Sequence, residues 1–132
     1  MMVHRTILVA ALATAATAFT FASADATNTV KIASSITIES HGLNFHGKVK
    51  SENAGCRDGR HVSLYRKFSD GSRQRVGVFV TGANGKWHIT VSGSAGITFS
   101  RFYAKVRQRK EGTAGTIFVC KSADSEVTRV ED

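Results

Sequence analysis

The stretch that decides the fold is LNFHGKVKS, residues 43–51. Apolar or small residues stand at every second position (Leu43, Phe45, Gly47 and Val49), and polar residues stand between them. Successive side chains of a β-strand point to opposite faces, so this period of two indicates a strand with one buried and one solvent-facing side. Lys48 and Lys50 are expected on the solvent-facing side.

The same alternation recurs along the chain, and Gly-, Asn- and Ser-rich segments separate the alternating stretches. We predict further strands at residues 35–39, 60–67, 73–81, 86–91, 100–109, 116–120 and 126–130. Asp70-Gly71 and Asn84-Gly85 fall between consecutive strands, which is typical of hairpin turns. No stretch shows a sustained apolar period of about 3.6 residues. An all-β domain is therefore expected, an antiparallel β-sandwich of about seven or eight strands.

The inward positions of these strands define the expected core. Its members are Ile36, Ile38, Leu43, Phe45, Val49, Val62, Leu64, Val76, Val78, Val80, Trp87, Ile89, Val91, Phe102, Ala104 and Val106. Because Trp87 alternates with polar residues on the inward side of its strand, we assign it to core packing and not to an exposed platform for sugars.

The N-terminal residues are typical of an export signal and are excluded from the fold. His4 and Arg5 precede an uncharged run rich in Ala, Leu, Val and Phe, and Ala22-Ser23-Ala24 has the small-x-small pattern of a cleavage site. The run has about 16 residues, fewer than the roughly 20 that span a bilayer. We predict a signal peptide at residues 1–24 cleaved after Ala24 or Ala26, a short leader at 25–34 and one domain at 35–132.

Cys56 and Cys120 are the only cysteines in the chain. An exported protein meets an oxidising compartment, where paired cysteines normally form a disulfide. The bond would close a loop of about 65 residues and stabilise the fold by roughly 4 kcal/mol in the chain-entropy model. Free thiols or a redox pair are the alternatives, although the C-x-x-C motif of redox pairs is absent. We therefore predict a structural disulfide and a secreted, extracellular or cell-surface protein.

Four short motifs resemble those of a known family. They are the G-x-V strand in Phe45–Ser51, the V-x-L-Y strand in Val62–Arg66, the hairpin Thr81–Trp87 and the strand Phe102–Val106. Together they resemble the carboxypeptidase-regulatory-like and transthyretin-like β-sandwich modules of secreted proteins, and the resemblance covers residues 36–130. It implies a sandwich fold and no particular activity. The chain departs from the family at Gly82, where an Asp is usual, and an immunoglobulin-like sandwich with a Cys-Trp-Cys arrangement is the alternative.

No constellation of residues in the sequence indicates catalysis. Most acidic residues fall in turns or near the C-terminus, without the spacing of an acid/base pair. The Gly-x-Ser-x-Gly nucleophile motif is absent. His41, His46, His61 and His88 do not follow the spacing of metal ligands. We predict that the protein is not an enzyme and that it binds neither a cofactor nor a metal ion.

Positive charge is the clearest functional indication, because the chain carries a formal net charge of +8. Lys105, Arg107 and Arg109 alternate along one predicted strand, and Lys48 and Lys50 alternate along another. If those two strands are neighbours, one basic face results, formed by Lys48, Lys50, Tyr103, Lys105, Arg107 and Arg109. Such a face attracts anionic partners. We predict binding to an anionic cell-wall polymer, a polysaccharide or a membrane surface, whereas export disfavours nucleic acid.

Two other functions fit the same sequence. The exposed charges keep a small β protein soluble and its strand edges unpaired, which suits a structural exported protein with no dedicated site. A small secreted hydrolase or inhibitor acting through the loop Ser51–Gly59 is the remaining alternative. Salt-sensitive binding to acidic polymers separates the binding module from the structural protein, and substitutions confined to the loop test the third function.

Overall fold

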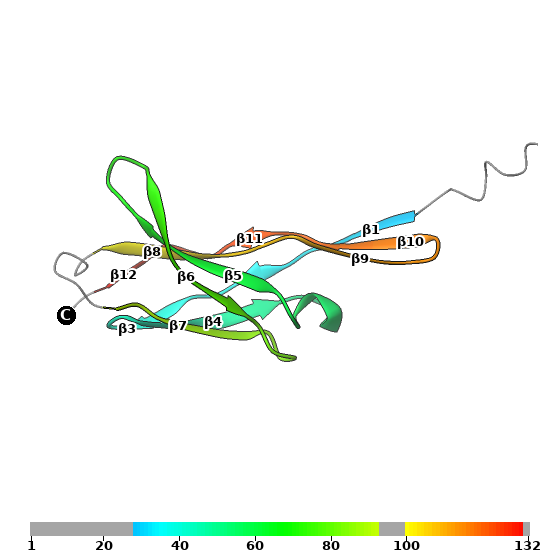
Figure 1. The fold of residues 1–132 in the computed structure, drawn as a ribbon, viewed down its shortest axis with the longest axis horizontal. Helices are drawn as coiled ribbons and strands as arrows, with labels where there is room; N and C mark the ends of the chain where they lie inside the picture. The colour runs from blue at the N-terminus through cyan, green and yellow to red at the C-terminus, as the bar shows by residue number, and fades with distance from the viewer. Residues whose placement is uncertain (1–27, 93–99, 131–132) are drawn as a thin grey trace, which may run out of the picture.

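The computed structural model describes residues 28–92 and 100–130, which fold into a β-sandwich (Figure 1). Twelve strands in these residues belong to three sheets, and four of the strands (β2, β3, β11 and β12) have only two or three residues. The predicted signal peptide lies outside the described residues. Within the described ranges, no helix is long and apolar enough to cross a membrane.

One layer of the sandwich is built around β8 (Arg101–Val106) and β5 (His61–Lys67). β6 (Arg73–Val80) pairs with the other edge of β5, and the short strands β11 (Ala123–Asp124) and β12 (Thr128–Arg129) both pair with β8. All of these neighbours are antiparallel.

The second layer is built around β4 (Asn44–Lys50), the strand predicted from residues 43–51. β2 (Ser35–Ile36) and β3 (Glu39–His41) pair with one edge of β4, and β7 (Lys86–Thr90) pairs with the other. In Figure 1 the strands β3, β4 and β7 lie below β5 and β8.

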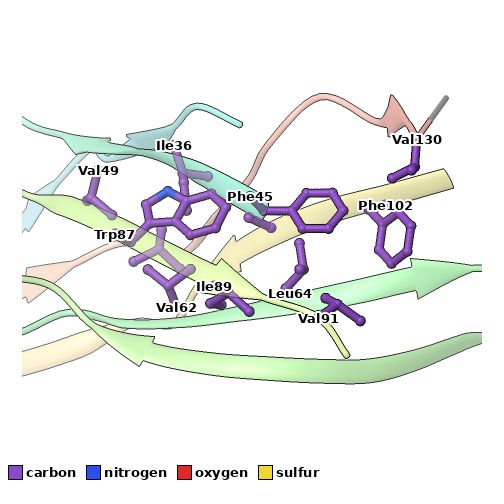
Figure 2. Packing of buried hydrophobic residues seen from close by; sticks show 12 residues of the cluster. Ile36, Phe45, Val49, Val62, Leu64, Trp87, Ile89, Val91, Phe102 and Val130 are labelled. Carbon is purple, nitrogen blue, oxygen red and sulfur yellow. The ribbon is translucent and has the colours of Figure 1, made fainter. Parts of the chain in front are cut away.

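The apolar core lies between the two layers (Figure 2). Phe45 of β4 and Phe102 of β8 meet across it, with ring centroids 4.7 Å apart. Trp87 is 1% exposed, and its indole nitrogen donates a hydrogen bond to the carbonyl of Thr37 at 3.2 Å. The prediction that Trp87 belongs to the core is therefore confirmed.

The third sheet extends beyond the sandwich as a narrow arm (Figure 1). It consists of β1 (Asn28–Ile32), β10 (Thr116–Cys120) and β9 (Arg109–Thr113), in the order β1-β10-β9. β1 lies in the segment predicted to be a leader and runs parallel to β10. Because four of its five residues are exposed, alternating burial does not mark it as a strand.

The disulfide between Cys56 and Cys120 is confirmed, with the two Cα atoms 5.4 Å apart. Cys56 ends the 3-10 helix η2 (Ala54–Cys56), and Cys120 ends β10. The bond fastens the loop after β4 to the arm. A buried disulfide of this kind favours an oxidising compartment.

The prediction that Val78 and Val80 are buried is wrong, because they are 63% and 54% exposed. The register of β6 against β5 shifts between Leu64 and Tyr65, where one extra residue of β6 is accommodated. Leu64 pairs with Gly77 and Val62 pairs with Phe79, which places Gly77 and Phe79 on the inner side of the sheet and the two valines on the outer side. A β-bulge thus reverses the alternation on which the prediction depended.

Candidate functional site

Two tyrosines lie side by side on the outer face of the β5–β6–β8 sheet. Tyr65 of β5 pairs in register with Tyr103 of β8 on one side and with Arg75 of β6 on the other. The tyrosine rings are stacked, with centroids 5.4 Å apart and planes 22° apart. Directly opposite side chains of paired strands share one face, so the three side chains form a continuous surface.

Arg73 of β6 lies against both tyrosines. Its guanidinium carbon is 4.3 Å from the centre of the Tyr65 ring, and its Nη1 donates a hydrogen bond to the Tyr103 hydroxyl at 2.7 Å. These contacts, the hydrogen bond to Tyr103 first, raise the pKa of Arg73 above its ordinary value. The guanidinium is therefore a permanent charge held in one orientation on an exposed surface, with further N–H donors available.

The β5–β6 turn gives this surface a concave shape. The turn is held by Asp70, whose carboxylate accepts hydrogen bonds from the Ser72 amide at 2.8 Å and the Ser72 hydroxyl at 2.6 Å. In Figure 1 the hairpin stands away from the sandwich above β8. Beside it lies a hollow of about 340 Å³. Its lining residues are Lys67, Gly71, Arg73, Tyr103, Asp124, Ser125 and Val127.

Cations surround the tyrosine pair. We define the tyrosine face as Tyr65, Lys67, Arg73, Arg75, Arg101, Tyr103 and Lys105, which the strand registers place on the same side of the sheet. Lys105 pairs with Asp124 at 3.8 Å. The other four cations have no carboxylate within ion-pair distance in the described part of the chain. The face therefore carries an excess of positive charge that the protein itself does not neutralise.

The structure brings together only some of the predicted binding residues. Tyr103 and Lys105 belong to the tyrosine face, but Lys48 and Lys50 lie on β4 in the other layer. β4 pairs with β2, β3 and β7, whereas β8 pairs with β5, β11 and β12, so the condition that the two strands are neighbours is not met. The six predicted residues do not form one surface.

Arg109 contacts the protein itself. Its guanidinium donates hydrogen bonds to the carbonyls of Gly55, Asp58 (2.8 Å) and Gly59 (3.0 Å), and lies 3.4 Å from Glu111. It therefore holds the loop Ser51–Gly59 against β9. The predicted strand of residues 100–109 is divided here, because β8 ends at Val106 and β9 begins at Arg109. Arg107, the other predicted residue of this segment, lies exposed between them.

Arg60 is a buried cation that the sequence reasoning missed. Its side chain is 0% exposed and donates hydrogen bonds to Ser34 Oγ (2.9 Å) and to the carbonyls of Cys56 (2.6 Å), Arg107 (2.9 Å) and Lys121 (3.0 Å). Burial, and secondarily the charge of Arg109, lowers its pKa. Arg60 thus connects four chain segments where the sandwich meets the arm.

The sequence reasoning also missed Arg73 and Arg75, although the sequence holds a usable signal. If the two strands that flank the Asp70-Gly71 turn pair as a hairpin, Lys67 lies opposite Arg73. Two residues further from the turn, Tyr65 then lies opposite Arg75, as it does in the structure. The buried Arg60 has no such signal. It follows a Gly-rich loop, and arginine is normally expected at the surface.

The histidines are divided between surfaces. His46 lies 3.1 Å from Glu39 and stacks on His41 at 5.7 Å, and His88 contacts Phe79 at 4.6 Å. Among the described residues, no group of three or more His, Cys, Asp or Glu is placed to hold a metal ion.

The chain was compared with known proteins. No family model matches it, and no curated protein matches it. The resemblance to the carboxypeptidase-regulatory-like and transthyretin-like modules stays a prediction.

Proposed function

We propose that this protein is a secreted, non-catalytic binding module that holds an anionic polysaccharide on its tyrosine face. The predicted signal peptide supports export, and the Cys56–Cys120 disulfide is of the kind that persists in an oxidising compartment. The tyrosine face supports an acidic ligand, because its charge is positive and mostly unpaired.

The observation that carries the proposal is the fixed orientation of Arg73. A planar guanidinium matches the paired oxygens of carboxylate, sulfate or phosphate groups, and it binds them best when its orientation is already set. The contacts with Tyr65 and Tyr103 set that orientation before any ligand arrives. Less side-chain freedom is then lost on binding.

The two tyrosines add contact area of a suitable kind. Tyrosine presents an apolar ring and a polar hydroxyl together, which suits a ligand with both apolar C–H and polar O–H groups. The hollow beside Arg73 can accommodate a projecting group of the ligand, and Lys67 is one of the residues that line it. An anionic sugar unit would thus meet a cation, an aromatic ring and a hydroxyl in one place.

The test uses dextran sulfate as the probe and uncharged dextran of equal length as its control. We expect the protein to bind dextran sulfate, to bind uncharged dextran at least tenfold more weakly, and to lose affinity as salt rises from 50 to 500 mM, because salt screens exposed charges. Losing two exposed cations at about 0.7 kcal/mol each weakens binding about tenfold. The Arg73→Gln/Arg75→Gln variant should show that loss.

The matched control is Lys31→Gln/Lys110→Gln, which removes the same charge from exposed positions on the arm. It should retain the affinity of the wild-type protein within about twofold, since only general attraction is reduced. Equal losses in the two variants would show that net charge, and not the tyrosine face, determines binding. Absence of binding by the wild-type protein would contradict the proposed function as a whole.

A further inference from the structure

A second basic surface lies on the opposite side of the sandwich. Lys48 of β4 pairs in register with Lys86 of β7, and His46 pairs with His88. Together with Lys50 they surround a shallow hollow of about 590 Å³ on the outer side of this layer. We define the lysine face as Lys48, Lys50 and Lys86.

The lysine face is as poorly neutralised as the tyrosine face. Glu39 is the acidic residue in the lining of the hollow, and its carboxylate is paired with His46 at 3.1 Å. In the described ranges, none of the three lysines has a carboxylate within ion-pair distance. Lys48, Lys50 and Lys86 are all exposed. The surface therefore attracts anions by the same physics as the first one.

The two faces point in opposite directions. The inward side chains of β4 and β8 meet in the core, where the rings of Phe45 and Phe102 are in contact. Outward residues of the same strands, Lys48 and Tyr103, must therefore lie on opposite surfaces. Stacked sheets are about 10 Å apart, and the outward side chains extend further on both sides, so the charged groups of the two faces are separated by more than about 10 Å.

We propose that the protein cross-links anionic polysaccharide chains, with one chain on the tyrosine face and a second on the lysine face. This inference rests on the proposed function. A polymer chain bound to one face leaves the other face, on the opposite layer of the sandwich, open to a further chain. A second chain, or a distant segment of the first, occupies the opposite face, and each bound module then joins two segments.

The experiment is a two-step capture with the exported protein in its oxidised form. Beads carrying dextran sulfate are loaded with protein and washed, and fluorescent soluble dextran sulfate is then added. The wild-type protein should recruit the soluble chain, and loaded beads given fluorescent uncharged dextran should not. The soluble form of the protein is checked for monomeric state by sedimentation, because a dimer would also bridge.

The deciding variant is Lys48→Gln/Lys50→Gln/Lys86→Gln. It should still load onto the beads through the tyrosine face, but it should recruit at least tenfold less soluble chain than the wild-type protein at equal loading. The matched control is Lys31→Gln/Lys110→Gln/Lys121→Gln, which removes three exposed lysines outside both faces and should recruit as the wild-type protein does.

The outcomes separate the inference from the proposed function. If the wild-type protein does not load onto the beads, the proposed function fails. If it loads but recruits no second chain, or if the triple variant of the lysine face recruits as much as the wild-type protein, the cross-linking inference is overturned and single-face binding stands. The inference is also overturned if the wild-type protein is a dimer and the lysine-face variant still recruits the soluble chain, because bridging then comes from the dimer and not from the two faces of one molecule.

Discussion

Replacing Arg60 with Met should destabilise the protein more than any other single change at a charged residue that the structure describes. The guanidinium donates four hydrogen bonds between 2.6 and 3.0 Å. A hydrogen bond from a charged group contributes about 1.5–3 kcal/mol, so four contribute about 6–12 kcal/mol. Burying the cation, whose Nε has no hydrogen-bond partner within residues 28–92 and 100–130, costs about 3–7 kcal/mol, which leaves a net contribution of about 3–5 kcal/mol.

The consequence is measurable by thermal unfolding of the oxidised protein. For a domain of about 100 residues, 1 kcal/mol corresponds to about 4 °C at the low end, so the Tm should fall by about 12–20 °C. Methionine retains apolar volume, and the loss therefore reports the hydrogen bonds and not a cavity. Arg60→Lys retains the charge but not the planar arrangement of donors, and its Tm should fall between those of the wild-type and Met variants.

Arg107→Met is the matched control, since the Arg107 side chain is exposed and its carbonyl can still accept a bond from Arg60. Its stability should change by less than about 0.5 kcal/mol. An Arg60→Met variant that unfolds within 3 °C of the wild-type protein would refute the stabilising role of the four hydrogen bonds that Arg60 donates to Ser34 Oγ and the three carbonyls.

Three further predictions follow from local geometry. Cys56→Ser should lower the free energy of unfolding by about 4 kcal/mol relative to the oxidised wild-type protein, as measured by urea denaturation. The reduced wild-type protein is the control and should lose the same amount. Gly47→Ala should cost about 3 kcal/mol or more in the same assay, because a Cβ there would overlap the Thr37 carbonyl, and a smaller loss would show that the backbone at Thr37 moves away. Hydrogen bonds from Ser72, the side-chain bond first, lower the pKa of Asp70 in the folded protein. The stability that these bonds provide is therefore fully present above the ordinary pKa of an Asp and is lost as the pH falls through the lowered pKa of Asp70. Ser72→Ala should raise the Asp70 pKa in an NMR titration, and an unchanged pKa would contradict the assignment.

The fold class could be predicted because its signal is local. The alternation in residues 43–51 depends only on the pleat of a single strand, and Phe45 and Val49 are buried as expected. Val78 and Val80 were mispredicted because a bulge changes the phase of one strand relative to another, and the isolated Gly77 beside it is the one sequence feature that indicates such a bulge. β1 was missed for a related reason: its pairing with β10 depends on backbone hydrogen bonds, and its side chains remain exposed.

The candidate site was predicted only in part because a surface depends on which strands share a sheet. Local alternation correctly indicated that Tyr103 and Lys48 point outward, but it carries no information on whether β8 and β4 are neighbours. That relation is decided by packing between distant segments, such as the contact between Phe45 and Phe102. The expected single basic face therefore becomes two faces on opposite layers.

The basic residues of this protein fall into two groups, those that bond to the protein's own carbonyls and those that face solvent, and only the second group is available to a ligand. Arg60 and Arg109 donate to backbone carbonyls at the junction of sandwich and arm, where no solvent anion could replace those bonds without disrupting the loop around Cys56. Arg73 and Lys48 face solvent, and loss of their charge leaves the core unchanged. Because the stabilising cations are separate from the exposed ones, the surface charges can be removed without unfolding the protein. Removing exposed cations should therefore weaken binding without lowering stability, and an Arg73→Gln/Arg75→Gln variant that lost stability as well as affinity would contradict this division.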